Sequence, residues 1–274
     1  MIPDHDPAPR PPLTIEYAFL LALVAPLLHL LWGIMFAGIG FKLPESQDGM
    51  AVLVTYGGIF ALCAARFRQP PARQLGFVAA PLSAWLAVLF LAPTLVLTSE
   101  LNNVLNSVLP SVPMPAAALV PAQRFTGPAL AVLGIAVYPL AYGVFFRGVL
   151  QPLATARLGV VPGVLGTAVM AAFGSAFLPA LLTGSLLARS PLLLDALVLC
   201  VLRQCAGSLY PALALEALWG AAGVAATYQL FGLAGFDAGG THTPGPWVAG
   251  ATALMLVGLA LCRTAARSAS PAQG

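Results

Sequence analysis

The chain has 274 residues, of which 59% are hydrophobic and only 8% are charged, and its mean hydropathy is +0.92. A soluble domain carries about 25% charged residues, most of them on a surface that faces water, so this composition excludes an ordinary soluble protein. The net charge of +3 is too small to indicate a nucleic-acid partner. We therefore expect an all-α, polytopic membrane protein whose main partner is the lipid bilayer.

Eight apolar stretches follow one another along the chain and predict a bundle of about eight transmembrane helices. They cover residues 14–39, 50–65, 76–98, 127–157, 160–183, 191–204, 209–231 and 246–262. We expect four regions: an N-terminal tail at 1–13, helices with an outer loop at 14–124, a core at 125–232, and a loop, last helix and basic tail at 233–274. The tail is acidic and proline-rich, so no cleaved signal peptide is expected.

The longest connection, residues 99–126, contains a helical pattern. Its apolar residues recur at helical spacing, and they are Leu101, Val104, Leu105, Val108 and Leu109. With Ser99 as the N-cap, this pattern predicts a short amphipathic helix on the bilayer surface. An ordered loop is the alternative interpretation.

Arginine placement predicts the orientation of the bundle. In an eight-span arrangement, one side receives Arg10, Arg66, Arg68, Arg73, Arg157, Arg203, Arg263 and Arg267. The other side receives only Lys42, Arg124 and Arg189. Because basic residues accumulate on the cytoplasmic side, both termini are predicted to be cytoplasmic.

Few ionisable residues lie inside the apolar stretches. They are Arg147, Glu216, Asp195 and the weakly basic His29. Each costs several kcal/mol in a bilayer (roughly 3 kcal/mol at the helix centre) unless it is paired or hydrated, so each is a candidate functional residue. Asp195 follows Pro191 near the predicted outer end of its helix, and we expect it to face lipid headgroups.

Three segments resemble the motifs of the CAAX-protease and bacteriocin-processing family of intramembrane proteases. They are FFRGVLQPLATARLG (145–159), AAFGSAFLPALL (171–182) and SLYPALALEALWGAAG (208–223). The resemblance covers about 125–232 and implies a CAAX-protease-like helical core in a bacterial inner membrane. It also implies an ancestral activity, peptide hydrolysis within the bilayer by a water that a glutamate activates.

This chain departs from the family motifs at the catalytic positions. Tyr142 and Gly143 stand where the family has two glutamates, and Phe177 stands at the histidine of the second motif. Glu216 and Gly220 replace the histidine and asparagine of the third motif. Of the named motif positions, only two keep the family residue: Arg147 in the first motif and Phe173 in the second.

The replacements remove the groups that hydrolysis requires. A general base must take a proton from water, and an imidazole or amide must stabilise the charge that develops on the carbonyl oxygen. No metal site or cofactor is predicted, because the remaining side chains do not supply converging ligands. Four cysteines, Cys63, Cys200, Cys205 and Cys262, are expected to be buried apolar residues.

We therefore expect a catalytically inactive family member that binds a membrane-embedded peptide or assists an active processing protease. Arg147 and Glu216 are predicted to form an ion pair with about 3–6 Å between their charged atoms. Tyr142 is expected to join them in a polar cluster. Two alternatives remain: an active endopeptidase that uses Glu216, although a carboxylate held by arginine accepts protons poorly, and a small-solute transporter.

Overall fold

The protein is described by a computed structural model. It describes residues 12–40, 44–108, 127–174, 190–228 and 242–269, together with Leu230 and Gly235. Every regular element in these residues is helical, which confirms the prediction of an all-α chain for this part.

The described helices follow one another in chain order. The first half contains α1 (Ile15–Gly38), α2 (Pro44–Ala64), α3 (Pro71–Leu75), α4 (Leu82–Leu91) and α5 (Thr94–Val108). A continuous helical run follows, made of α6 (Gly127–Val132), η2 (Leu133–Val137), α7 (Tyr138–Tyr142), η3 (Gly143–Leu150) and α8 (Gln151–Leu158). The last elements are α9 (Val160–Gly174), α11 (Pro191–Ala206), α12 (Tyr210–Thr227) and α13 (Gly245–Ala269).

Five helical segments of the described residues are long and apolar enough to cross a bilayer. They cover Ile15–Gly38, Gln47–Ala64, Leu82–Leu105, Leu133–Leu158 and Gly245–Ser268. Many of their large apolar side chains face outward, as Leu20, Leu23 and Leu31 of α1 do. Such surfaces suit a lipid environment, so these helices indicate an integral membrane protein. The predicted count of eight spans is not confirmed.

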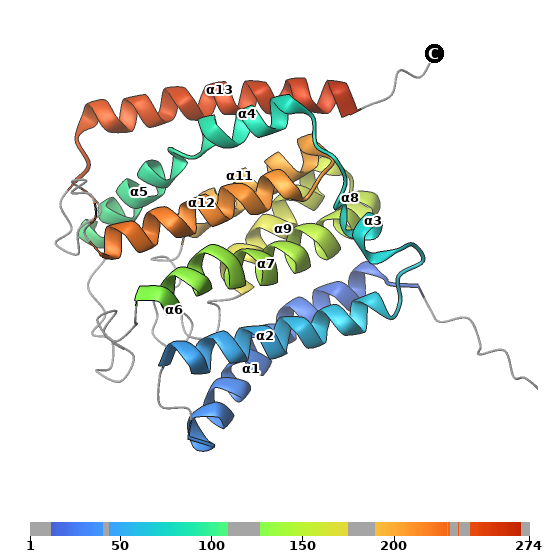
Figure 1. The fold of residues 1–274 in the computed structure, drawn as a ribbon. Helices are drawn as coiled ribbons and strands as arrows, with labels where there is room; N and C mark the ends of the chain where they lie inside the picture. Colours follow the sequence, from blue (N-terminus) through green and yellow to red (C-terminus); the bar gives the residue numbers. More distant parts are fainter. Residues whose placement is uncertain are drawn as a thin grey trace, which may run out of the picture.

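The helices form a bundle with two outer pairs and a central group (Figure 1). α13 packs along α4 on one side, and α1 packs along α2 on the other. α11 and α12 lie between these pairs, and α12 contacts the run 127–158 through η2, α7 and η3. The run also packs on α1 and α2, with Phe145 and Phe146 buried in a shared apolar core. The helix that carries Arg147 is therefore enclosed on several sides.

The prediction that a helix begins at Ser99 is wrong. α5 already begins at Thr94, and Ser99 lies in its second turn. The break between α4 and α5 lies at Ala92 and Pro93, where the proline has no backbone N–H to continue the helical ladder. The Ala92 carbonyl accepts a hydrogen bond from Trp219 Nε1 at 2.9 Å, which ties this break to α12.

Arginines are concentrated at one end of the bundle. Of the described arginines, Arg147 lies in the interior, and the others are Arg66, Arg68, Arg73, Arg157, Arg203, Arg263 and Arg267. These seven follow or end α2, α3, α8, α11 and α13, whose ends lie at the end of the bundle where α1 begins (Figure 1). Contacts join this end: the Arg66 guanidinium lies 3.8 Å from the centroid of the Tyr17 ring.

Candidate functional site

An ion pair in the bundle interior is the centre of the candidate site. Arg147 Nη1 donates to Glu216 Oε2 at 2.6 Å, and Arg147 Nη2 donates to Glu216 Oε1 at 3.2 Å. The Arg147 side chain is 4% exposed and that of Glu216 is 19% exposed. The shorter of the two separations lies just below the predicted 3–6 Å range. Both carboxylate oxygens are therefore engaged by one guanidinium.

The ion pair lies near the middle of a membrane-crossing segment. Arg147 is 14 residues beyond the start of the segment Leu133–Leu158, roughly 21 Å along an axis of about 39 Å. Arg147 lies on η3, a π-helical turn that widens the helix over Gly143–Leu150. Such turns are uncommon and are frequent at functional sites. At this depth each charged group loses its hydrating water and gains mainly the attraction of its partner. The stability of the pair therefore depends on its hydrogen-bond geometry.

Two glycines, Gly143 and Gly220, form close contacts near the ion pair. A Cβ at Gly143 would overlap a methyl group of Leu213 and would lie 3.2 Å from Arg147 Nη1 and from Glu216 Oε2. A Cβ at Gly220 would overlap the carbonyl oxygen of Gly134, on the backbone of η2. A larger residue at position 220 therefore requires α12 and η2 to move apart. At these two positions, neighbouring atoms fill the space that a larger side chain would need.

Tyr142 belongs to an aromatic group beside the ion pair. Its ring meets Tyr56 edge to face with centroids 4.8 Å apart, and it stacks with Tyr138 and Phe146. Within the described residues, the Tyr142 hydroxyl bonds to neither Arg147 nor Glu216. The structure thus places the tyrosine on the neighbouring turn and brings only the two charged residues into contact.

Of the two phenylalanines singled out in the sequence, Phe173 lies in α9. Phe177 lies outside the described residues. Phe173 packs against a small core between α9 and α11 that includes Ala168, Ala172 and Cys200. Close by, Gln151 Nε2 donates to the Cys200 carbonyl at 2.8 Å and joins α8 to α11.

The sequence predicted that Asp195 faces lipid headgroups, and the structure shows that it does not. Thr98 Oγ1 donates to Asp195 Oδ1 at 2.5 Å, so the carboxylate joins α11 to α5 inside the bundle. The prediction rested on the position of Asp195 near the predicted outer end of its helix, whereas α5 begins at Thr94 and packs along α11 there.

A second polar cluster, which sequence reasoning missed, links α1, α2 and α7. Asp48 Oδ1 pairs with His29 Nε2 at 3.0 Å, and the Tyr138 hydroxyl donates to Asp48 Oδ2. Asp48 precedes the predicted apolar stretch that begins at residue 50, and only ionisable residues inside such stretches were considered, although α2 already begins at Pro44. The usable signal was His29 in the middle of an apolar helix, since a polar group there requires a partner.

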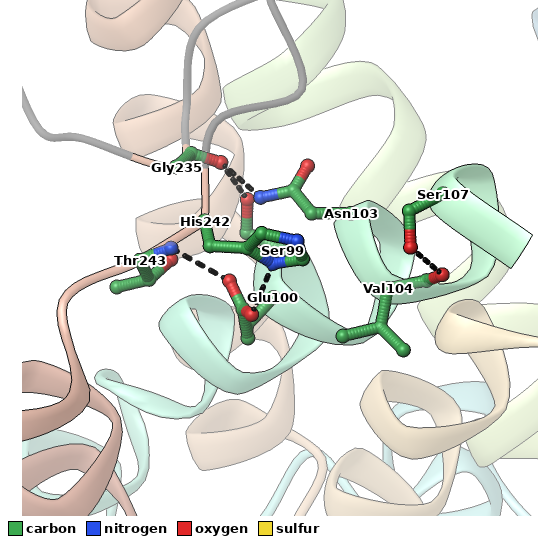
Figure 2. Close-up of polar contacts among 8 residues, drawn as sticks. All are labelled: Ser99, Glu100, Asn103, Val104, Ser107, Gly235, His242 and Thr243. Carbon is green, nitrogen blue, oxygen red and sulfur yellow. Dashed lines mark hydrogen bonds and ion pairs between the residues drawn. The ribbon is translucent and has the colours of Figure 1, made fainter.

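A third polar cluster fixes the segment that precedes α13 (Figure 2). Glu100 accepts hydrogen bonds from the Thr243 backbone N–H at 2.7 Å and from His242 Nδ1 at 2.8 Å. Ser99 Oγ and Asn103 Nδ2 both donate to the Gly235 carbonyl, at 2.7 and 2.9 Å. The face of α5 that bears Ser99, Glu100 and Asn103 therefore anchors this segment.

The chemistry available to the ion pair is limited by its neighbours. Within the described residues, no three His, Cys, Asp or Glu side chains come together as metal ligands. The stretch 175–189, which includes Phe177, contains none of these residue types. The arrangement can hold two charges in balance and can bind a polar group through Arg147, whose buried Nε has no hydrogen-bond partner in the described part of the chain.

No protein-family model, curated protein or solved structure matches this chain.

Proposed function

We propose that the chain is a CAAX-protease-like membrane protein that has lost its hydrolytic groups and acts by binding. Its partner is a membrane-embedded peptide or an active protein-processing protease. The proposal rests on one observation: the carboxylate that stands at the third motif, Glu216, is held by both terminal nitrogens of Arg147. A base that is engaged in this way is not free to take a proton from water.

The surroundings of the pair support the same interpretation. Gly143 and Gly220 replace a family glutamate and asparagine, and close contacts fill the space around both glycines. The aromatic group around Tyr142 adds ring surface next to the pair, and within the described residues none of its hydroxyls donates to Glu216. A site built in this way offers shape and a neutralised charge pair, features that suit recognition better than hydrolysis.

The proposed protein crosses the bilayer eight times. α9, α11 and α12 complete the five longer segments, because each contributes an apolar core helix of 15 to 18 residues in the described part of the chain. The end that carries the seven arginines faces the cytoplasm of a bacterial cell, following the positive-inside rule. This topology places both termini in the cytoplasm.

The proposal is tested in proteoliposomes with a dye-labelled transmembrane peptide of about 20 apolar residues. Energy transfer from the protein to the peptide reports binding, and mass spectrometry of the recovered peptide reports cleavage. The expected result is saturable binding with intact peptide, for the wild type and for Glu216→Gln alike. Cleavage by the wild type that is lost in Glu216→Gln would overturn the proposal and favour an active endopeptidase.

A further inference from the structure

An apolar groove runs along the outside of the bundle between α2 and the helical run 127–158. Its volume is about 370 Å³, and Tyr56 is the one lining residue with a polar side-chain atom. The lining extends from Ala136 to Val149, roughly 20 Å of helix. One leaflet of a bilayer has a hydrocarbon thickness of about 15 Å, half of the usual core. The groove is therefore apolar, as an acyl chain is, and long enough to hold the part of the chain that crosses one leaflet.

One end of the groove is bounded by a basic segment. Phe60 near the end of α2 and Leu75 at the end of α3 both line the groove, and the chain between them carries Arg66, Arg68 and Arg73. Arg66 lies over the Tyr17 ring, whereas Arg68 and Arg73 are exposed. Within the described residues, none of these three arginines forms an ion pair with a carboxylate.

A fourth arginine lies against the same segment from the bundle side. Arg203 Nη2 donates to the Leu75 carbonyl at 3.4 Å, and its guanidinium leaves no room for a side chain at Gly76. Arg203 Nε is buried and has no hydrogen-bond partner in the described part of the chain. Within the part of the chain that the structure describes, no carboxylate therefore forms an ion pair with the arginines at this end of the groove.

We propose that this groove binds an anionic phospholipid of the surrounding membrane, with one acyl chain along α2 and the phosphate between Arg68 and Arg73. The apolar lining matches the chain, and the unpaired arginines match the negative headgroup. A zwitterionic lipid brings its own ammonium group to the arginines and gains less. This inference does not depend on the proposed function, because it uses neither Arg147 nor Glu216.

The lipid would also contact the aromatic group around Tyr142. Tyr56 lines the groove on one side and meets Tyr142 on the other, with ring centroids 4.8 Å apart. The acyl chain therefore supports the packing of α2 against α7 and η3.

Two pairs of variants test the inference in the full-length protein. Gly57→Phe places a ring in the groove, because Gly57 lines it and has no atom within 4 Å of an added Cβ. Gly58→Phe is the matched control, since it has the same open surroundings on the next residue and does not line the groove. Arg68→Gln with Arg73→Gln removes the charge, and Arg263→Gln with Arg267→Gln is its control at the same end of the bundle.

Native mass spectrometry of protein released from nanodiscs of equal phosphatidylglycerol and phosphatidylcholine measures the bound lipid. The wild type is expected to retain phosphatidylglycerol selectively. Removing Arg68 or Arg73 should each weaken this retention about fivefold, the effect of one juxtamembrane charge. Gly57→Phe should abolish the retention. Gly58→Phe and the Arg263→Gln, Arg267→Gln control should behave as the wild type. Equal retention of the two lipids, or equal losses in test and control variants, would overturn the inference.

Discussion

Gly220 in α12 and Gly134 in η2 touch backbone to backbone, so that a Cβ at Gly220 would overlap the Gly134 carbonyl oxygen. The reverse contact is looser: a Cβ at Gly134 would lie 3.4 Å from a methyl group of Val224 and 3.7 Å from the Gly220 carbonyl oxygen. This asymmetry makes Gly220 the position that sets the distance between the two helices, and this distance keeps Glu216 within reach of Arg147.

Replacing Gly220 with alanine should therefore destabilise the protein. We expect a loss of about 1–3 kcal/mol in the free energy of unfolding, because the added methyl group meets backbone that cannot rotate away. Thermal or denaturant unfolding in detergent, followed by circular dichroism, measures the loss. Gly223→Ala is the control on the same helix, since nothing lies within 4 Å of its Cβ. It should be neutral or stabilising by up to about 1 kcal/mol. Equal stability of the two variants would refute the close contact.

The Asp48 cluster should contribute to the packing of α1, α2 and α7. Asp48→Ala leaves the His29 and Tyr138 donors without their acceptor, and we expect it to cost about 1–3 kcal/mol of unfolding free energy. Tyr138→Phe removes one hydrogen bond and should cost about 1 kcal/mol. Tyr210→Phe serves as the control, because Tyr210 is 46% exposed and its change should stay within about 0.5 kcal/mol. If Tyr138→Phe matches this control, the hydroxyl of Tyr138 does not bond to Asp48 in the membrane.

Glu100 should control the mobility of the segment before α13. The Thr243 amide donates to Glu100 Oε2 at 2.7 Å, so Glu100→Ala should accelerate hydrogen exchange at this amide by roughly ten- to a hundredfold. Ser107→Ala is a matched change on the same helix, because Ser107 Oγ bonds only locally to the Val104 carbonyl (Figure 2). An unchanged exchange rate in Glu100→Ala would show that other contacts hold this segment.

Composition and hydropathy were sufficient to predict an all-helical membrane protein, because apolar stretches of membrane length dominate the chain. The pairing of Arg147 with a carboxylate could be predicted because few ionisable residues lie in the apolar stretches and a buried charge needs a partner. The distance and the two-pronged geometry of that pair depend on helix packing, which one sequence does not encode in its local pattern.

Other features depended on contacts between distant residues. Gly220 has no sequence signal that separates it from Gly223, since only the approach of η2 makes one of them obligatory. The widened turn over Gly143–Leu150 has no local sequence signature either. The start of α5 was missed because apolar periodicity marks a helix face and not its first residue, whereas Pro93 indicated the break.

The proposed loss of hydrolysis requires that Arg147 and Glu216 neutralise each other. A double-mutant cycle tests this requirement most directly. The unfolding free energies of Arg147→Met, Glu216→Gln and the double variant are compared with that of the wild type in one detergent. Each single variant should lose about 3–5 kcal/mol, because it leaves a buried charge or a buried donor without its partner. The double variant should lose at least about 2 kcal/mol less than the sum of the singles. Losses that add to within about 0.5 kcal/mol would contradict the account, since the two residues would then act independently.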